Sequence, residues 1–325
     1  LVVCLALSVS LSAQTIDPPP GMIAWWPLDE SSGPAEDLVA SNTGEWINSP
    51  AGCTGMVAGG LQMTSSDDYV KIPHNSSLNT GEGDFSIDMW IKTNQSDGVH
   101  TIIDKRSNSQ PERGFTFYLW DGKLGLKLGD ADGYYNFNSQ LFVTDNVWHA
   151  IAVTVDRDDP EGLIFYVDDA SEKKNPTAYQ GSLSNEGDML IGGNCINASH
   201  FLKNGCLDEI ELFNRVLHPV ELERIYNAVS DGKDKELFNH KIHWPQLPDN
   251  QDGFSVNASL NSSGPLYIAD DFECTESGLI TDITFWGQQY EHDPEDIKFY
   301  IAIAEKNTNV VGSILWQRTF NPDQV

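Results

Sequence analysis

The sequence predicts an all-β protein: a two-sheet antiparallel sandwich followed by a second, truncated β-rich domain. Three observations predict this fold class. Short alternating apolar runs are separated by clusters of Gly, Asn, Asp and Pro, and long helical periodicity is absent. Two Asp-Gly pairs, at 121–122 and 132–133, have the composition of tight hairpin turns. The one short helical pattern follows the last strand pattern of the first domain.

The first thirteen residues, LVVCLALSVSLSA, form an apolar run that ends in small residues. Such a run is typical of a secretory signal peptide, which predicts a secreted or cell-surface protein. A buried strand or helix is the alternative, but the Gln-Thr-Ile-Asp-Pro-Pro-Pro that follows favours export. An initiator Met and a basic region are absent, so we expect the N-terminus to be incomplete. No later stretch is long enough to span a bilayer.

Within residues 22–230 the strand patterns follow one another at intervals suited to an antiparallel sandwich. They include TFYLW (116–120), LGLKLG (124–129), HAIAVTV (149–155), LIFYV (163–167) and MLIGG (189–193). In the last strand pattern, Glu209 and Glu211 alternate with Ile210 and Leu212. This period of two indicates a half-buried strand, which ends the β-part of the first domain.

Pro219 opens a segment whose apolar residues have helical spacing up to Ala228, and we expect no other substantial helix. The polar stretch 231–252, which has no apolar period, predicts a linker. Residues 253–325 return to strand patterns, among them 265–272, 278–290, 297–306 and 313–320. The sequence stops in mid-pattern, so this β-rich module is expected to be truncated.

The formal net charge is −29 at pH 7, from 48 acidic and 19 basic residues. Nucleic acids and anionic membrane surfaces are bound through Lys and Arg, so this charge argues against both classes of partner. It favours divalent cations and keeps the chain soluble. Adaptation to saline or extracellular surroundings explains the same composition equally well.

Catalytic motifs are absent from the sequence, which has no G-x-S-x-G elbow, no H-E-x-x-H pair and no P-loop. The nearest approach to the carboxylate run of sandwich β-glucanases is the cluster at 208–211, Asp-Glu-Ile-Glu, and its order differs. His149 is expected to be a packed or hydrogen-bonded strand residue. We therefore predict that this chain is not an enzyme. Whether the full-length protein has catalytic activity is left open.

Residues 129–138, GDADGYYNFN, place aromatic side chains among short polar ones. Aromatic rings stack on the C–H faces of sugars, and polar side chains on loops bind the hydroxyl groups. The predicted ligand contacts are Tyr134, Tyr135, Asp130 and Asp132. Core packing is the alternative, and it is favoured for Phe137 and Trp120. Core positions are also predicted for Trp25, Trp26, Trp90 and Trp148.

Five segments occur in order: AWWPLDE (24–30), GGLQMTSSDDYVKIP (59–73), GDFSIDMWIKT (83–93), VWHAIAVTVDRDDPEGLIFYVDD (147–169) and GCLDEIELFNRVLHPVELERIYNA (205–228). They resemble strands of the laminin-G-like, concanavalin A-like jelly-roll family in bacterial exported proteins, over about residues 22–230. The resemblance implies a two-sheet jelly roll. Residues 269–287, ADDFECTESGLITDITFWG, resemble an uncharacterised β-rich module of similar proteins, which implies no activity.

A structural Ca²⁺ in the resembled family commonly lies where the first and last strands meet. The matching positions are the acidic pair Asp29-Glu30, then Asp37 and Asp208, and the predicted ligands are Asp29, Asp37 and Asp208. Calcium takes about six to eight oxygen ligands, which loop carboxylates and turn carbonyls can supply. The intervening loop reads EDLVASNTGEW, so Asn42 and Gly44 are shifted from the family's pattern. A solvated acidic rim, or capping of backbone amides, is the alternative.

The sequence contains five cysteines, Cys4, Cys53, Cys195, Cys206 and Cys274. Cys195 and Cys206 flank a ten-residue loop, and an exported protein permits oxidation, so we predict a disulfide between them. A metal site is less favoured because no C-x-x-C spacing accompanies them. Cys53 and Cys274 lie in different predicted domains, and we expect free or locally buried thiols.

These features predict a secreted, non-catalytic and calcium-stabilised module that recognises carbohydrate or other extracellular ligands. A structural adhesion or spacer domain that binds protein is one alternative. An accessory domain of a larger glycan-active enzyme, with its catalytic part elsewhere, is another. The pattern does not indicate an oligomeric state.

Overall fold

A computed structural model describes residues 15–235, 299–307 and 310–320. The chain divides into two units, residues 1–239 and 240–325. In the second unit the described backbone is an antiparallel hairpin of β16 (Phe299–Asn307) and β17 (Val310–Phe320). The predicted signal peptide, most of the predicted linker and most of the predicted second domain lie outside the described residues. Within those described, no helix is long and apolar enough to cross a membrane.

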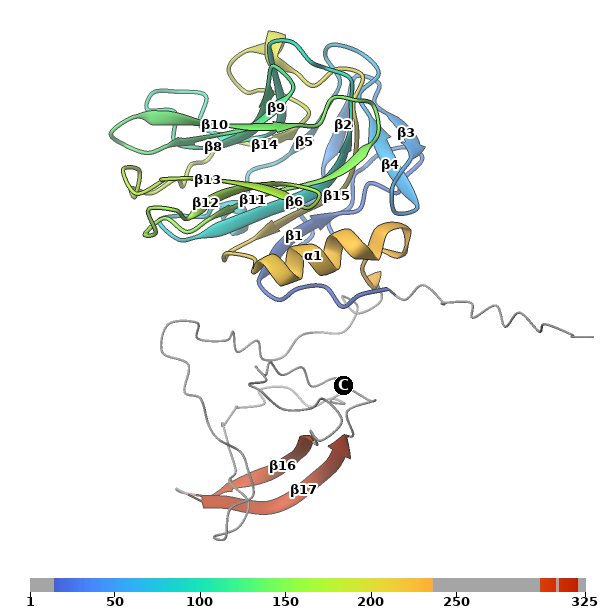
Figure 1. The fold of residues 1–325 in the computed structure, drawn as a ribbon, viewed down its shortest axis with the longest axis vertical. Coiled ribbons are helices and arrows are strands. Elements are labelled where there is room, and N and C mark those ends of the chain that lie inside the picture. Colours follow the sequence, from blue (N-terminus) through green and yellow to red (C-terminus); the bar gives the residue numbers. More distant parts are fainter. Residues whose placement is uncertain (1–14, 236–298, 308–309, 321–325) are drawn as a thin grey trace, which may run out of the picture. The chain divides into compact units, whose positions relative to one another are not determined.

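The strands of the first unit form two antiparallel sheets that face each other (Figure 1). The back sheet has the order β13-β12-β11-β6-β15-β4-β3, and β1 also pairs with β15. Its strands are β1 (Met22–Trp26), β3 (Ala51–Thr54), β4 (Gly59–Gln62), β6 (Phe85–Lys92), β11 (Trp148–Val155), β12 (Leu163–Val167), β13 (Ala170–Lys174) and β15 (Cys206–Phe213).

The front sheet has the order β10-β9-β8-β7-β14-β5-β2. Its strands are β2 (Glu45–Ile47), β5 (Tyr69–Ile72), β7 (Val99–Arg106), β8 (Gly114–Trp120), β9 (Lys123–Gly129), β10 (Tyr134–Phe142) and β14 (Met189–Ile191). Single 3₁₀ turns lie at Ser76–Leu78, Ala198–His200 and Val229–Asp231. The predicted fold class, a two-sheet jelly-roll sandwich, is confirmed.

The α-helix of this unit, α1 (Pro219–Ala228), lies where the sequence predicts it. His218 caps its first turn, and the Glu221 side chain accepts a hydrogen bond from the His218 backbone N–H, which completes a capping box. Figure 1 shows α1 against the outer side of the back sheet. Tyr226 stacks on Trp90 of β6, with ring centroids 6.0 Å apart, so the helix covers part of this outer side.

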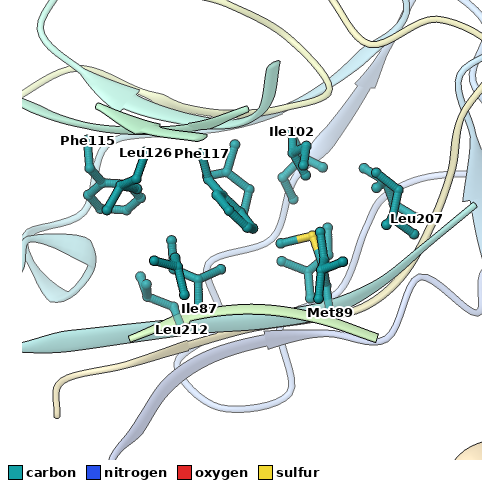
Figure 2. Close-up of a cluster of buried hydrophobic side chains, with 14 of the residues drawn as sticks. Ile87, Met89, Ile102, Phe115, Phe117, Leu126, Leu207 and Leu212 are labelled. Carbon is teal, nitrogen blue, oxygen red and sulfur yellow. The ribbon is translucent and has the colours of Figure 1, made fainter. Parts of the chain in front are cut away.

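The hydrophobic core fills the space between the sheets (Figure 2). Because strand residues alternate between faces, every second side chain of a strand points inward. The front sheet contributes Ile102, Phe115, Phe117 and Leu126, and the back sheet contributes Ile87, Met89, Leu207 and Leu212. Burying one such side chain stabilises the fold by about 1.5–3 kcal/mol. The residues between these inward positions therefore form the outer faces of the sandwich.

The hairpin turn between β8 and β9 fixes the register of the front sheet. Asp121 and Gly122 both have positive φ, 49° and 76°. This backbone is that of a type I′ turn, whose twist matches the flanking strands and which Asp-Gly favours. The two-residue turn places Trp120 directly opposite Lys123. The Asp-Gly hairpin prediction at 121–122 is confirmed.

The segment after α1 packs back onto the sandwich. Ile16 N donates to Gly232 O at 3.0 Å, and Asp234 N donates to Ile16 O at 2.9 Å. Lys233 is only 3% exposed, although it stands within the polar stretch predicted as a linker. The boundary at residue 231 stays a prediction, but residues 232–235 belong to the first unit.

Candidate ligand-binding surface

The outer face of β8–β10 carries a row of three side chains, in which the rings of Trp120 and Phe142 are exposed and Lys123 is half-buried. Lys123 of β9 is paired with Trp120 of β8 on one side and with Phe142 of β10 on the other. Trp120 is 47% exposed and Phe142 is 60% exposed. Lys123 Nζ lies 4.9 Å from the centroid of the Phe142 ring and donates to Gln140 Oε1 at 2.8 Å. The row combines two flat apolar surfaces with a cationic donor.

The next row on the same face is Tyr118, Gly125 and Asn138. A Cβ on Gly125 would stand 2.4 Å from Tyr118 Cε2, so the tyrosine ring lies flat over the glycine backbone. Tyr118 donates its phenolic hydrogen to Asn138 Oδ1 at 2.7 Å. Burial raises the pKa of Tyr118, so the phenol stays protonated as a donor. The ring is thereby fixed beside the exposed row.

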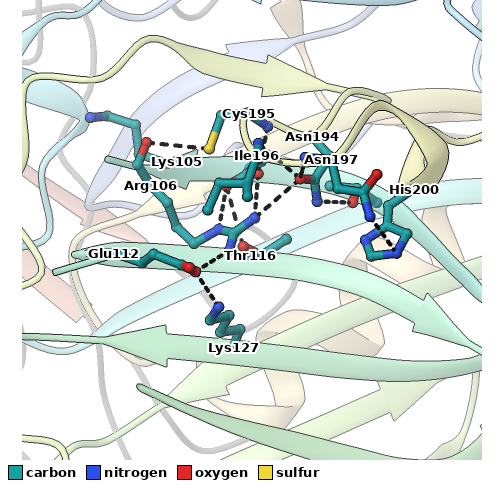
Figure 3. Close-up of polar contacts among 12 residues, drawn as sticks. Lys105, Arg106, Glu112, Thr116, Lys127, Asn194, Cys195, Ile196, Asn197 and His200 are labelled. Carbon is teal, nitrogen blue, oxygen red and sulfur yellow. Dashed lines mark hydrogen bonds and ion pairs between the residues drawn. The ribbon is translucent and has the colours of Figure 1, made fainter. Parts of the chain in front are cut away.

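Further along the face, charged side chains neutralise one another (Figure 3). Arg106 of β7 makes a two-point contact with Asp104, at 2.8 and 2.7 Å, and a third with Glu112 at 2.9 Å. Glu112 also pairs with Lys127 of β9. Lys127 Nζ lies 3.5 Å from the centroid of the Tyr134 ring. Bidentate Arg–carboxylate pairs of this kind hold their side chains in one geometry.

The pKa shifts follow from this arrangement. Burial opposes ionisation of Glu112, but its contacts with Lys127 and Arg106 prevail and lower its pKa. Burial is the main influence on Lys127 and lowers its pKa, although Glu112 opposes the change. Glu112 is therefore held as the charged partner of Lys127 and Arg106, and both oxygens of Asp104 accept hydrogen bonds from Arg106.

The four predicted ligand contacts do not share one surface. Tyr134 and Tyr135 are each 51% exposed, but adjacent strand residues point to opposite faces. Tyr134 stands on the outer face under Lys127, whereas Tyr135 stacks on Tyr179 with ring centroids 5.7 Å apart. Asp130 is only 4% exposed.

Asp130 serves the turn between β9 and β10. Its carboxylate accepts hydrogen bonds from Asp132 N at 2.9 Å and from Gly181 N at 3.2 Å. Asp132 itself is exposed in the same turn. Of the predicted set, Tyr134 is thus the residue on the outer face of β8–β10, and binding by all four stays a prediction.

Several residues of this surface were missed from the sequence. Phe137 is 5% exposed, as the core prediction requires, but Trp120 is 47% exposed and the core prediction for it is wrong. The hairpin predicted at 121–122 indicates the outward position of Trp120. Core residues Leu119 and Leu124 flank the turn, so the alternation assigns Trp120 and Lys123 to the opposite, outer face.

The three predicted calcium ligands are not gathered into one site. The Asp37 carboxylate binds backbone N–H groups of its own loop and of β1. It accepts hydrogen bonds from Trp25 N, Val39 N and Asn42 N, each at 2.9 Å. Asp29 Oδ1 accepts from Gly59 N at 2.9 Å. The described residues contain no group of three or more acidic, His or Cys side chains placed to hold a metal ion.

Asp208 also accepts hydrogen bonds from backbone N–H groups, but through one of its two carboxylate oxygens. Its Oδ2 accepts from Met56 N at 2.7 Å and Val57 N at 2.8 Å, in the loop between β3 and β4. Its Oδ1 is buried and accepts no hydrogen bond within the described part of the chain. Burial raises the pKa of Asp208 to about 8, helped by the nearby Glu209 and Asp29. Asp208 thus keeps an oxygen for a cation, whereas both oxygens of Asp29 accept hydrogen bonds, from Gly59 N and from Lys235 Nζ.

The predicted Cys195–Cys206 disulfide does not form in the structure, where Cys53, Cys195 and Cys206 are all free thiols. The reason is the sheet topology. Cys195 follows β14 in the front sheet and donates to Arg106 O at 3.7 Å. Cys206 begins β15 in the back sheet, where its neighbour is Cys53.

A hollow of about 490 Å³ lies away from the outer face of β8–β10. It is lined by Gly33, Pro34, Thr43, Gly44, Glu45, Trp46 and Pro73. None of the predicted site residues lines it. Its polar side chains, Thr43 and Glu45, are few, whereas the outer face of β8–β10 combines rings, amides and cations.

The fold of the first unit agrees with what comparison with known proteins shows. Residues 64–223 match the profile of the concanavalin A-like lectin/glucanases superfamily. This part of the chain is a laminin-G-like domain. Residues 242–309 match a domain of unknown function, DUF7901, which agrees with the uncharacterised module expected after the laminin-G-like domain. No curated protein sequence matches the chain.

Solved structures resemble the laminin-G-like domain in fold. The binding domain of Paraclostridial Mosquitocidal Protein 1 has a TM-score of 0.54 at 17% identity, over 64% of this chain and 52% of that one. The binding domain of botulinum neurotoxin DC in complex with rat synaptotagmin II has a TM-score of 0.48 at 15% identity, with coverages of 64% and 52%. The botulinum neurotoxin serotype D domain in complex with N-acetylneuraminic acid has a TM-score of 0.48 at 14% identity, with coverages of 64% and 50%. The chain therefore spans about half the length of these structures.

Proposed function

We propose that the laminin-G-like domain is a secreted, non-catalytic module that binds carbohydrate through the outer face of β8–β10. The observation that carries this proposal is the row of Trp120, Lys123 and Phe142, whose two rings are exposed. Exposed rings give sugar C–H faces a flat apolar surface, while amide and ammonium groups bind hydroxyls.

The rigidity of the surface supports the same proposal. The rings stand on strands whose other faces are packed in the core, and Tyr118 is fixed by Gly125 and Asn138. A ligand that binds a preformed surface does not lose affinity to the ordering of loops. Strand-borne side chains therefore suit recognition of a repeating, hydroxyl-rich ligand.

The carboxylates of this face favour binding over hydrolysis. Glycosidases use two carboxyl groups, one of them a proton donor with a raised pKa. Asp104 and Glu112 instead form ion pairs with Arg106 and Lys127, and the pKa of Glu112 is lowered. These two acids hold the surface in shape, which fits a non-catalytic role.

Binding of an extracellular protein is the second candidate, because a flat surface with exposed aromatic rings and a cation also suits a protein partner. Trp120 and Phe142 would then be anchors buried at the centre of an interface. A structural adhesion or spacer role falls under this candidate. The two candidates predict different responses to isolated glycans.

A glycan array probed with the full chain tests the proposal. We expect binding to at least one class of glycan and about tenfold weaker binding for Trp120→Ala and for Phe142→Ala, which corresponds to about 1.4 kcal/mol. Tyr134→Ala should also weaken binding, whereas Tyr135→Ala is the matched control, because it removes an equally exposed ring on the other side of β10. A folded wild-type chain that binds no glycan would favour the protein ligand.

A further inference from the structure

Cys53 and Cys206 meet across strand β4. Cys53 of β3 pairs with Gly60 of β4, and Cys206 of β15 pairs with Gln62 of the same strand. Residues two apart on a strand share a face, so both thiols stand on the face that carries Gly60. Cys53 Sγ lies 3.3 Å from the place where a Cβ of Gly60 would be. The glycine leaves the space in which the two sulfur atoms meet.

The two thiols differ in reactivity. The hydrogen bond from Cys53 lowers the pKa of Cys206, and the same contact, together with burial, raises the pKa of Cys53. Lys92, which is paired with Cys206 in β6, also favours the Cys206 thiolate. Because the thiolate is the nucleophile in thiol–disulfide exchange, Cys206 is the attacking residue of the pair.

We propose that Cys53 and Cys206 are a redox site that closes to a disulfide when the chain meets a small-molecule disulfide such as oxidised glutathione. The Cys206 thiolate attacks one sulfur of the reagent, breaks its S–S bond and releases one thiolate. Cys53 then loses its proton and attacks Cys206 Sγ, which releases the second reagent thiolate. Two electrons pass from the protein to the reagent, and the two released thiolates take up the two protons.

Cys195 does not compete for this reaction. It stands at the end of the front sheet, with its sulfur against the Arg106 carbonyl. Burial raises the pKa of Cys195 to about 12, so little thiolate forms. Cys53 and Cys206 are both only partly buried, which leaves them open to a small reagent.

Bond formation requires the edge of the back sheet to move inward. A disulfide joins Cα atoms about 4.4–6.8 Å apart, whereas β4 lies between the two strands here. β3 has β4 as its single neighbour in the sheet, and alternate residues of β3 are exposed. The approach of β3 therefore also shifts β4 at Gly60 and Gln62, the residues paired with the two cysteines, but it moves no strand beyond β4. The bond would fasten β3 to β15, on which Asp208 already holds the β3–β4 loop through Met56 N and Val57 N.

Peptide mapping of the full chain tests the site. The chain is reduced, then incubated with oxidised glutathione, alkylated and digested without reductant. We expect mass spectrometry to find a linked pair of peptides that contain Cys53 and Cys206, and Cys195 alkylated. A linkage of Cys195 to either residue, or alkylation of both Cys53 and Cys206 after oxidation, would overturn the proposal.

Matched variants give a second readout. Oxidation should raise the Tm of the wild type and of Cys195→Ser by about 5–10 °C, because a disulfide constrains the unfolded chain. Cys53→Ser and Cys206→Ser should lose this shift. In the reduced wild type, iodoacetamide should label Cys206 faster than Cys195. Equal labelling rates would contradict the assignment of Cys206 as the attacking thiol. Because this experiment uses the wild type, it does not depend on whether the variants fold.

Discussion

Asp88 of β6 and Glu211 of β15 lie directly opposite each other in the back sheet, and both carboxyl groups are buried. A side-chain hydrogen bond joins them. Two buried carboxylates so close cannot both be ionised at low cost, so the pair shares a proton. Burial raises the pKa of Asp88 to about 6 and raises the pKa of Glu211 well above its usual value.

A shared proton makes folding stability depend on pH. A carboxyl group whose pKa is higher in the folded chain binds its proton more tightly there than in the unfolded chain. Its contribution is present below the unfolded value of 4.5 for Glu211 and is lost as pH rises. The surrounding charges are those of Glu209, Lys233 and Lys235.

Glu211→Gln should remove this dependence. The amide has the shape of the protonated acid, so it can donate to Asp88 and accept from Lys233 without binding a proton. From pH 5 upward, the free energy of unfolding of the variant should rise relative to that of the wild type by about 1.4 kcal/mol per pH unit. This holds for as long as Glu211 of the folded wild type stays protonated. Urea unfolding at pH 5, 6.5 and 8 measures the difference. A constant difference across these pH values would show that no shared proton exists.

Lys233 is the cation that neutralises this carboxylate group. Its Nζ lies 2.5 Å from Glu211 Oε1 and 3.7 Å from Glu209 Oε2, and the side chain is buried. Lys233→Met should destabilise the chain by about 3–5 kcal/mol at pH 8, since it leaves buried carboxylates without their partner. The loss should be smaller at pH 5, where more of the acids are protonated. Lys173→Met, which removes an exposed ion pair with Glu161, should leave the urea midpoint nearly unchanged.

The fold was open to sequence reasoning because its signals are local. Alternation along LGLKLG and HAIAVTV, the Asp-Gly turn and the capped start of α1 are each set by neighbouring residues. The resemblance supplied the order of the strands. Lys233 shows the limit of this reasoning: its partners are brought by β6 and β15, and nothing near it in sequence distinguishes it from a linker lysine.

The same limit explains the outcomes at the candidate sites. The short loop between Cys195 and Cys206 predicts that they pair, but the strand order places Cys206 beside Cys53 and Cys195 in the other sheet. The sequence predicts both Tyr134 and Tyr135 as ligand contacts, although adjacent strand residues face opposite ways. The row through Lys123 depends on pairing across three strands, which becomes visible when register is known.

His149 of β11 gives the folding stability a second pH dependence. This one comes from a histidine that is charged in the folded chain, not from a carboxyl group that is protonated there. Its ring contacts Asp168 Oδ2 at 2.7 Å and Asp145 Oδ1 at 3.0 Å. Burial opposes the charged form, but the two carboxylates prevail and raise the pKa of His149. The stabilisation is fully present below the unfolded value of 6.5 and is lost as pH rises through the folded pKa.

His149→Asn should therefore reduce stability more at pH 5 than at pH 8. Thermal unfolding at the two pH values measures the difference. His74→Asn is the control, since it makes the same substitution at an exposed position of the same domain. A loss of equal size at both pH values would mean that His149 contributes through packing and neutral hydrogen bonds.

Calcium stabilisation can be tested at Asp208. We propose that a cation engages Asp208 Oδ1, which is buried and accepts no hydrogen bond from the described residues. Calcium should raise the Tm by several degrees relative to a chelator, because a ligand that binds the folded state stabilises it. Asp208→Ala should lose the shift, whereas Asp37→Ala should keep it, since Asp37 holds backbone N–H groups. An unchanged Tm on chelation of the wild type would contradict the proposal.

Gly125 tests whether the geometry of the outer face is required for binding. A Cβ at this position would overlap the Tyr118 ring, so Gly125→Ala should push the ring out and break its hydrogen bond to Asn138. We expect a loss of about 1–3 kcal/mol in stability and weaker glycan binding with Trp120 and Phe142 still in place. Gly83→Ala is the matched control, because the contact given for a Cβ there is an ordinary 3.4 Å. Array binding and urea unfolding of both variants separate the effects: a destabilised Gly125→Ala that binds like the wild type would show that Tyr118 is no part of the ligand surface.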